Sequence, residues 1–208
     1  MKKIYFLAII FFIIFGSNNN LHSSCPTGYN SGSVTMTIGS CNYEVHYCYR
    51  CGLSYPGDIY ITEAILLTPN CIPLPLEQVL DQIYTHINNP QYFFNVLCPN
   101  SEVVPCDEIP NGGPSIELHW TYCWQVKLIQ YFGVTTYQYI PCENSATCNE
   151  YARFCYDVAT NSYIKTFSDI TISGYPDCID TEVWEITFPT QLNQVSECFI
   201  YRNTPCDF

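Results

Sequence analysis

The chain has 208 residues, of which only 12% are charged, and 19 acidic residues outnumber 7 basic ones for a net charge of −12 at pH 7. This acidity excludes nucleic acid and anionic membrane surfaces as partners, because both attract positive charge. Cysteine is abundant instead: there are 14 cysteines, in a chain long enough for one domain with a real core, or for two small ones.

The first 24 residues are typical of a secretory signal peptide. Lys2 and Lys3 precede an unbroken apolar run over residues 4–15, and this run is too short to cross a bilayer, which takes about 20 apolar residues. We expect cleavage between residues 16 and 24, leaving 5 basic residues against 19 acidic ones and a net charge of −14. The competing interpretation is a lipoprotein acylated at Cys25. No later segment is long and apolar enough for a transmembrane helix.

Three strand-like runs open the domain that remains, residues 25–208. Apolar and polar residues alternate at 34–38, 42–50 and 59–67, and a turn sequence at 54–58 separates the last two runs. We therefore expect the second and third strands to pair as a hairpin. The aromatic side of the second strand, which holds three tyrosines, is expected to face the core.

One amphipathic helix follows, at residues 76–87. Apolar side chains recur there at steps of three and four residues, and Pro75 suits a helix start because its missing N–H needs no partner in the first turn. The remaining chain is typical of short strands separated by turns, at residues 92–96, 116–128, 134–140, 151–158, 163–167, 170–173, 183–188 and 198–202. This pattern predicts a mainly β fold, an antiparallel sandwich or barrel-like domain with one helix.

The cysteines indicate a disulfide framework formed in an oxidising compartment. Their even number suits complete pairing, although spacing leaves the connectivity open. Cys48 and Cys51 form a C-x-x-C motif at a strand end, with no helix after it to lower a thiol pKa. We expect two unrelated structural disulfides there rather than a redox centre. The expected disulfide cysteines are Cys25, Cys41, Cys48, Cys51, Cys71, Cys98, Cys106, Cys123, Cys142, Cys148, Cys155, Cys178, Cys198 and Cys206.

Cysteine spacing also indicates a diverged internal duplication. The expected units span 41–98 and 148–206, with a shorter relative at 116–142, and in the first two a cysteine lies between aromatic residues near a strand end. If the duplication is real, equivalent cysteines have equivalent partners. The cysteines that correspond at one constant interval are Cys41, Cys48 and Cys71 in the first unit and Cys148, Cys155 and Cys178 in the second. With one inserted residue, Cys98 also corresponds to Cys206.

Polar residues beside the cysteines are the candidates for chemistry. Glu44 and His46 lie two positions apart on one strand, and Glu117 and His119 do so on another. Imidazoles and carboxylates bind zinc or act as base and acid, yet this spacing follows from strand alternation alone. We expect solvated strand faces, with no catalytic, metal or cofactor site. The alternative is a small secreted hydrolase or metal-dependent enzyme that uses His46 or His119.

Aromatic residues are the strongest indication of function. The chain holds 18 tyrosines and few charges, so tyrosines beyond those in the core would form an exposed aromatic surface suited to protein or glycan contacts. The alternative is that these rings pack only against disulfides and loops. We predict a secreted, extracellular, cell-surface or periplasmic protein with a structural or binding role and no catalysis.

Overall fold

The structure is a computed structural model that describes residues 25–52, 57–68, 70–71, 74–108, 114–143, 145–175, 178 and 187–206. The signal peptide expected at 1–24 and most of the strand expected at 183–188 lie outside the described residues. The elements in chain order are β1 (Asn30–Ile38), β2 (Cys41–Arg50), β3 (Gly57–Leu66), α2 (Leu76–Ile87), α3 (Pro90–Tyr92), η1 (Phe93–Leu97), β4 (Ser115–Thr121), β5 (Cys123–Tyr131), β6 (Val134–Pro141), β7 (Thr147–Asp157), β8 (Ser162–Ser173) and β9 (Phe199–Ile200).

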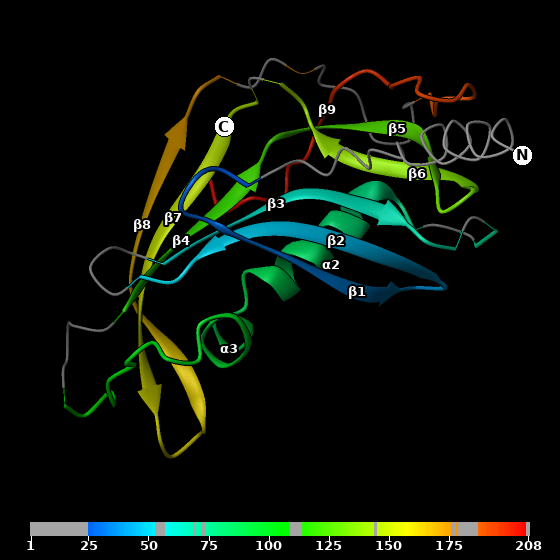
Figure 1. Ribbon diagram of the computed structural model, residues 1–208. Helices are drawn as coiled ribbons and strands as arrows, with labels where there is room; N and C mark the ends of the chain where they lie inside the picture. Colours follow the sequence, from blue (N-terminus) through cyan, green and yellow to red (C-terminus); the bar gives the residue numbers. More distant parts are fainter. Residues whose placement is uncertain are drawn as a thin grey trace, which may run out of the picture.

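The described strands form one sheet centred on β3 (Figure 1). One edge of β3 pairs with β2 in the predicted hairpin, and β2 pairs with β1. The other edge is shared, because β4 pairs in parallel with the start of β3 while β6 pairs antiparallel with its end. The sheet therefore forks at β3 into a β4–β7–β8 branch and a β6–β5–β9 branch. The mainly β, disulfide-rich fold is confirmed, with a single forked sheet in place of two facing sheets.

The chain changes from one branch to the other at Tyr122. The N–H of Tyr122 donates to the carbonyl of Ala146 at 3.0 Å, and its carbonyl accepts from the N–H of Tyr201 at 2.7 Å. The single strand predicted at 116–128 is consequently two strands, β4 and β5. Conversely, the two strands predicted after residue 162 are one continuous strand, β8, with a register irregularity opposite Arg153.

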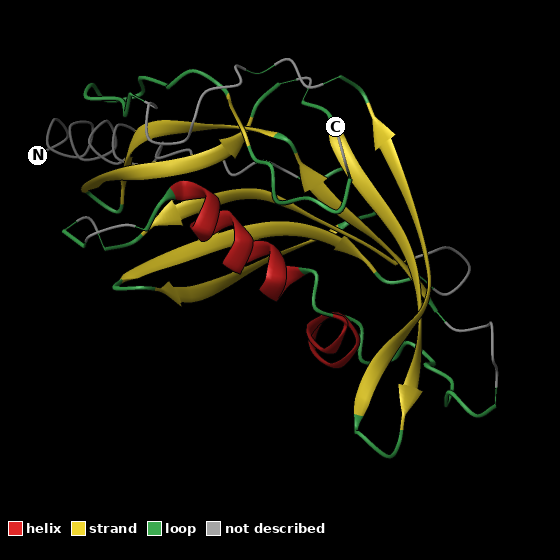
Figure 2. Ribbon diagram, turned by 180° about the vertical axis from the view of Figure 1, so that it is seen from behind, coloured by secondary structure: helices red, strands yellow, loops and turns green. Residues whose placement is uncertain are grey.

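Helix α2 covers one face of the sheet and coincides with the helix predicted at 76–87 (Figure 2). Its position follows from topology, since parallel strands need a crossover connection and α2 lies between the parallel strands β3 and β4. Its apolar stripe belongs to one buried core cluster with aromatic and aliphatic side chains of β2, β3 and β4. The buried residues of the stripe are Leu76, Val79, Leu80, Ile83, Tyr84 and Ile87.

The strand predicted at 92–96 is wrong, because these residues are helical. Pro90 occupies the first turn of α3, and the side chain of Asn89 accepts from the N–H of Gln91 at 2.8 Å as an N-terminal cap. The π-helical turn η1 follows directly. Phe93 and Phe94 are both buried, whereas a strand would place neighbouring side chains on opposite faces.

All 14 cysteines pair, as predicted, and none is free. The C-x-x-C motif is split between two structural disulfides, which confirms that prediction. The Cys25 sulfur lies in a disulfide, which leaves no thiol there for acylation. The pairs are Cys25–Cys48, Cys41–Cys71, Cys51–Cys98, Cys106–Cys155, Cys123–Cys178, Cys142–Cys198 and Cys148–Cys206.

The prediction that equivalent cysteines have equivalent partners is wrong. Cys41 pairs with Cys71, so a duplicated framework would pair Cys148 with Cys178. Cys148 pairs with Cys206 instead. The reason is topological: Cys178 lies after β8 and bonds to the start of β5, in the other branch of the fork.

Candidate functional site

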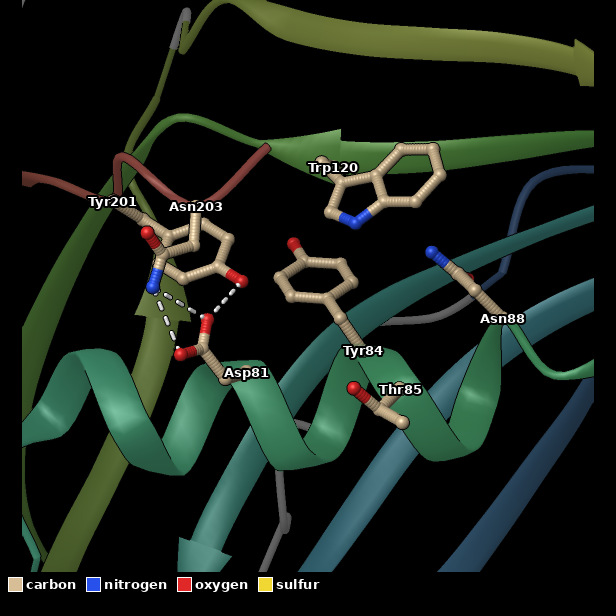
Figure 3. Close-up of a pocket in the computed structure, with 7 residues that line it drawn as sticks. All are labelled: Asp81, Tyr84, Thr85, Asn88, Trp120, Tyr201 and Asn203. Atoms are coloured by element: carbon tan, nitrogen blue, oxygen red, sulfur yellow. Dashed lines mark hydrogen bonds between the residues drawn. The ribbon is translucent and has the colours of Figure 1, made fainter. Parts of the chain in front are cut away.

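An open pocket of about 470 Å³ lies between α2, β4 and the segment that follows β9 (Figure 3). Its volume falls within the roughly 300–1,000 Å³ usual for small-molecule sites. The helix and its C-cap, Asn88, supply four lining residues at positions i, i+3, i+4 and i+7, which share one side of a helix. The lining residues are Asp81, Tyr84, Thr85, Asn88, Trp120, Tyr201 and Asn203.

Three aromatic rings form a nearly parallel row along this pocket. The centroids of Tyr84 and Tyr201 lie 5.3 Å apart with an interplanar angle of 17°, and those of Tyr84 and Trp120 lie 6.2 Å apart at 28°. Tyr84 and Tyr201 are only 3% and 2% exposed. Trp120 is half-buried, so it is the ring that a ligand can cover. Burial raises the pKa of Tyr84 to about 12, which keeps its phenol neutral near pH 7.

The polar side of the pocket is held in place by hydrogen bonds to Asp81. The hydroxyl of Tyr201 donates to Asp81 Oδ1 at 2.7 Å, and Asn203 Nδ2 donates to Oδ1 and Oδ2 at 3.0 and 2.8 Å. Burial and the bond to Asp81 raise the pKa of Tyr201. The amide of Asn88 has no hydrogen-bond partner among the described residues. The pocket thus combines a flat apolar wall with a fixed carboxylate and two amides.

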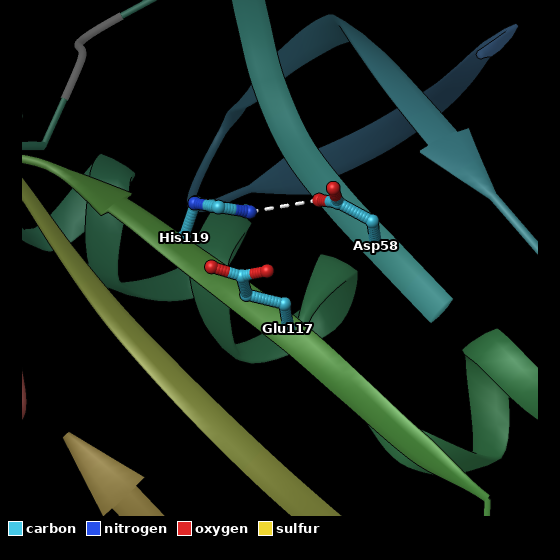
Figure 4. A group of neighbouring side chains, drawn as sticks. All are labelled: Asp58, Glu117 and His119. Atoms are coloured by element: carbon cyan, nitrogen blue, oxygen red, sulfur yellow. Dashed lines mark hydrogen bonds and ion pairs between the residues drawn. The ribbon is translucent and has the colours of Figure 1, made fainter. Parts of the chain in front are cut away.

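A second group of functional side chains lies on the outer face of the sheet, opposite α2 (Figure 4). Asp58 on β3 and Glu117 and His119 on β4 each offer a ligand atom, and these atoms lie within 4.8 Å of one another. His119 Nε2 is 2.7 Å from Asp58 Oδ1, and His119 Nδ1 is 2.7 Å from Asn149 Oδ1. A polar cluster therefore joins β3, β4 and β7.

Burial of Asp58 and His119 opposes charge on both side chains, but their contacts outweigh it. Hydrogen bonds from His119 and Tyr29 lower the pKa of the Asp58 carboxyl despite its burial. The bond to Asp58 likewise raises the pKa of the His119 imidazole, although burial alone would lower it. Arg50 adds a weaker contact, 3.5 Å from Asp58 Oδ2. Without a further ligand, the pair is a buried ion pair.

The structure separates the two pairs of candidate residues named from the sequence. Glu117 and His119 join Asp58, whereas Glu44 and His46 lie on β2 outside this group, with His46 Nε2 3.5 Å from Glu44 Oε1. The expectation of a solvated strand face is wrong for His119, whose side chain is 19% exposed and bonded through both nitrogens. It was wrong because Asp58, at the end of a turn sequence, was not expected to reach this face.

Another open pocket, of about 450 Å³, lies in the fork between β3 and the β5–β6 hairpin. Most of its lining residues have polar side chains, and Gln138 donates a hydrogen bond to the buried carboxylate of Glu63, which also lines the pocket. His119 lines neither this pocket nor the aromatic one.

The fold and these sites define a disulfide-rich, mainly β protein with an aromatic pocket on one face of its sheet and a polar cluster on the other. Among the described residues, no helix is long and apolar enough to cross a membrane. Comparison of the chain with protein-family models, with curated proteins and with solved structures found no match.

The pocket residues were not singled out from the sequence. Asp81, Tyr84 and Asn88 are spaced along one side of the helix. A tyrosine between an acid and an amide only weakly indicates a binding pocket. Trp120 and Tyr201 are far from the helix in sequence, so only the tertiary structure brings the rings together.

Proposed function

We propose that this protein is a secreted, non-catalytic binding protein that recognises carbohydrate in the pocket between α2, β4 and the segment after β9. The observation that carries this proposal is the row of Tyr201, Tyr84 and Trp120 beside a hydrogen-bonded Asp81. Such a pocket offers one apolar wall and a few oriented polar groups, the usual composition of a small-molecule site.

Carbohydrates match this combination. A sugar ring has a face of C–H groups that packs on a flat aromatic ring, and hydroxyls around its edge that need hydrogen-bond partners. Trp120 supplies a half-buried ring, and the Asp81 carboxylate retains lone pairs beyond those used by Tyr201 and Asn203. The buried rings behind Trp120 fix its position, which lowers the entropy lost on binding.

Export supports a role in contacting extracellular glycans. Seven disulfides require an oxidising compartment to form and persist, and the N-terminal sequence is typical of an exported chain. The enzyme alternative has less support, because His119 is not among the residues that line the aromatic pocket.

Affinity electrophoresis through gels that contain soluble polysaccharides tests the proposal. Hydroxyethyl cellulose, mannan, dextran and a soluble chitin derivative are suitable probes, with the disulfide-intact mature protein. Retardation of the wild type by at least one of them is expected. Trp120→Ala should weaken that binding by about 2 kcal/mol or more, some thirtyfold in Kd, because a central aromatic contact is lost.

Tyr175→Ala is the matched control, since Tyr175 is 90% exposed and lies outside the pocket. It should bind as the wild type does. If none of the polysaccharides retards the wild type, or if Tyr175→Ala abolishes binding while Trp120→Ala does not, the pocket is not the carbohydrate site.

A further inference from the structure

The cluster on the outer face has the features of a cation site. Asp58 and Glu117 are register partners in the parallel ladder of β3 and β4, so two carboxylates lie side by side. Like charges directly opposite each other destabilise a sheet. The carboxylate of Glu117 makes no side-chain hydrogen bond to the described part of the chain, and the residue is half-buried. A cation between the carboxylates would remove their repulsion.

The side chains around the cluster orient its ligand atoms. His119 faces Asn149 Oδ1 through Nδ1, and Asn149 Nδ2 in turn donates to Ser173 Oγ at 3.0 Å, which fixes the amide. His119 Nε2 is thereby aimed at Asp58 Oδ1. The Tyr29 hydroxyl donates to the other oxygen of Asp58. Metal-binding histidines and carboxylates typically have such outer hydrogen-bond partners.

We propose that Asp58, Glu117 and His119 bind a divalent transition-metal ion, with Zn²⁺ the best match. One imidazole and two carboxylates suit zinc, which takes three protein ligands and a water in open sites. Binding requires a neutral imidazole, so Nε2 gives up its proton to solvent as the ion binds. Arg50 contacts only Oδ2 of Asp58, which leaves Oδ1 for the metal.

The alternative is a metal-free ion pair in which protonated His119 compensates Asp58. The two differ in Glu117: the ion pair does not need it, whereas the metal site does. Glu117→Gln also preserves shape and leaves the bonds of Asp58 and His119 intact, so the variant should fold.

Isothermal titration calorimetry tests the proposal, with ZnCl₂ added to chelator-treated, disulfide-intact protein. The wild type should bind one equivalent, and Glu117→Gln and His119→Gln should each weaken binding at least tenfold. Asn149→Ala should weaken it by about 10- to 100-fold, as loss of an outer partner does. Zinc should raise the thermal midpoint of the wild type but not of Glu117→Gln.

His46→Gln is the matched control, because His46 also lies two positions from a glutamate but belongs to no group of three candidate metal ligands among the described residues. It should bind zinc like the wild type. Absence of saturable binding, unchanged binding in a folded Glu117→Gln variant, or equal loss in His46→Gln would overturn the proposal. Far-UV circular dichroism establishes that each variant is folded.

Discussion

Removal of single disulfides should show that a buried disulfide stabilises this fold by more than the chain-entropy contribution of its loop. Cys148–Cys206 is the one pair in which both residues are buried, with Cys148 0% and Cys206 7% exposed. In Cys51–Cys98 only Cys98 is buried, while Cys51 is exposed. We predict that replacing both cysteines of either pair by alanine destabilises the protein, and that loss of Cys148–Cys206 costs more.

The sizes follow from the sequence separations of 58 and 47 residues. In the chain-entropy account, a loop of either length contributes about 4 kcal/mol at 25 °C, nearly the same for both. The additional sulfur buried in Cys148–Cys206 should add about 0.5–1.5 kcal/mol, the cost of deleting one well-packed heavy atom. The summed contribution of all seven bonds exceeds the free energy of unfolding of a typical domain, which is roughly 5–15 kcal/mol. Full reduction should therefore unfold the protein.

Guanidinium unfolding at neutral pH, followed by circular dichroism and extrapolated to water, measures these differences. Intact mass after alkylation verifies that the other six bonds have formed in each variant. An equal or greater loss in the Cys51/Cys98 variant would refute the burial argument. A fully reduced protein that keeps a cooperative transition would refute the larger claim, because the aromatic core would then be sufficient alone.

Two further predictions concern packing and pH. Gly57→Ala should lower the free energy of unfolding by about 1–3 kcal/mol through overpacking, because the added Cβ would lie 2.6 Å from the Phe93 ring. Denaturation should show that the double variant with Phe93→Leu loses less stability than the sum of the two single variants. Additive losses would contradict the clash. Burial lowers the pKa of His86, so the contribution of this group to stability is complete above about pH 6.5 and is lost as pH falls through its lowered pKa. Thermal midpoints should therefore fall less between pH 7 and pH 5 in His86→Gln than in the wild type, and parallel curves would contradict this.

Local sequence patterns predicted the helices and strands in which buried side chains recur at one regular spacing. The helix at 76–87 and the hairpin of β2 and β3 were predictable because each places apolar side chains on one face. The aromatic run at Phe93 and Phe94 was misread, since β propensity of the side chains is outweighed there by the Pro90 helix start. The break at Tyr122 has no local signal, because it depends on partners from Ala146, just before β7, and from the C-terminal segment.

The candidate sites were less predictable because each joins distant parts of the chain. Glu117 and His119 could be named as a pair, but Asp58 reaches them only because β3 and β4 are parallel and in register. Parallel strands need a long crossover connection. The sequence pattern of short strands and turns did not distinguish such a connection from a series of antiparallel hairpins. The aromatic pocket likewise needs the C-terminal segment to return beside α2.

The two proposed sites meet at one strand. His119 and Trp120 are neighbours in β4, so their side chains point to opposite faces of the sheet. The ladder that holds β4 to β3 has only three residue pairs, and one of them places Asp58 beside Glu117. The junction of this branch is therefore short and carries like charges. A cation there would strengthen the same backbone that positions Trp120, although it would touch none of the residues that line the aromatic pocket.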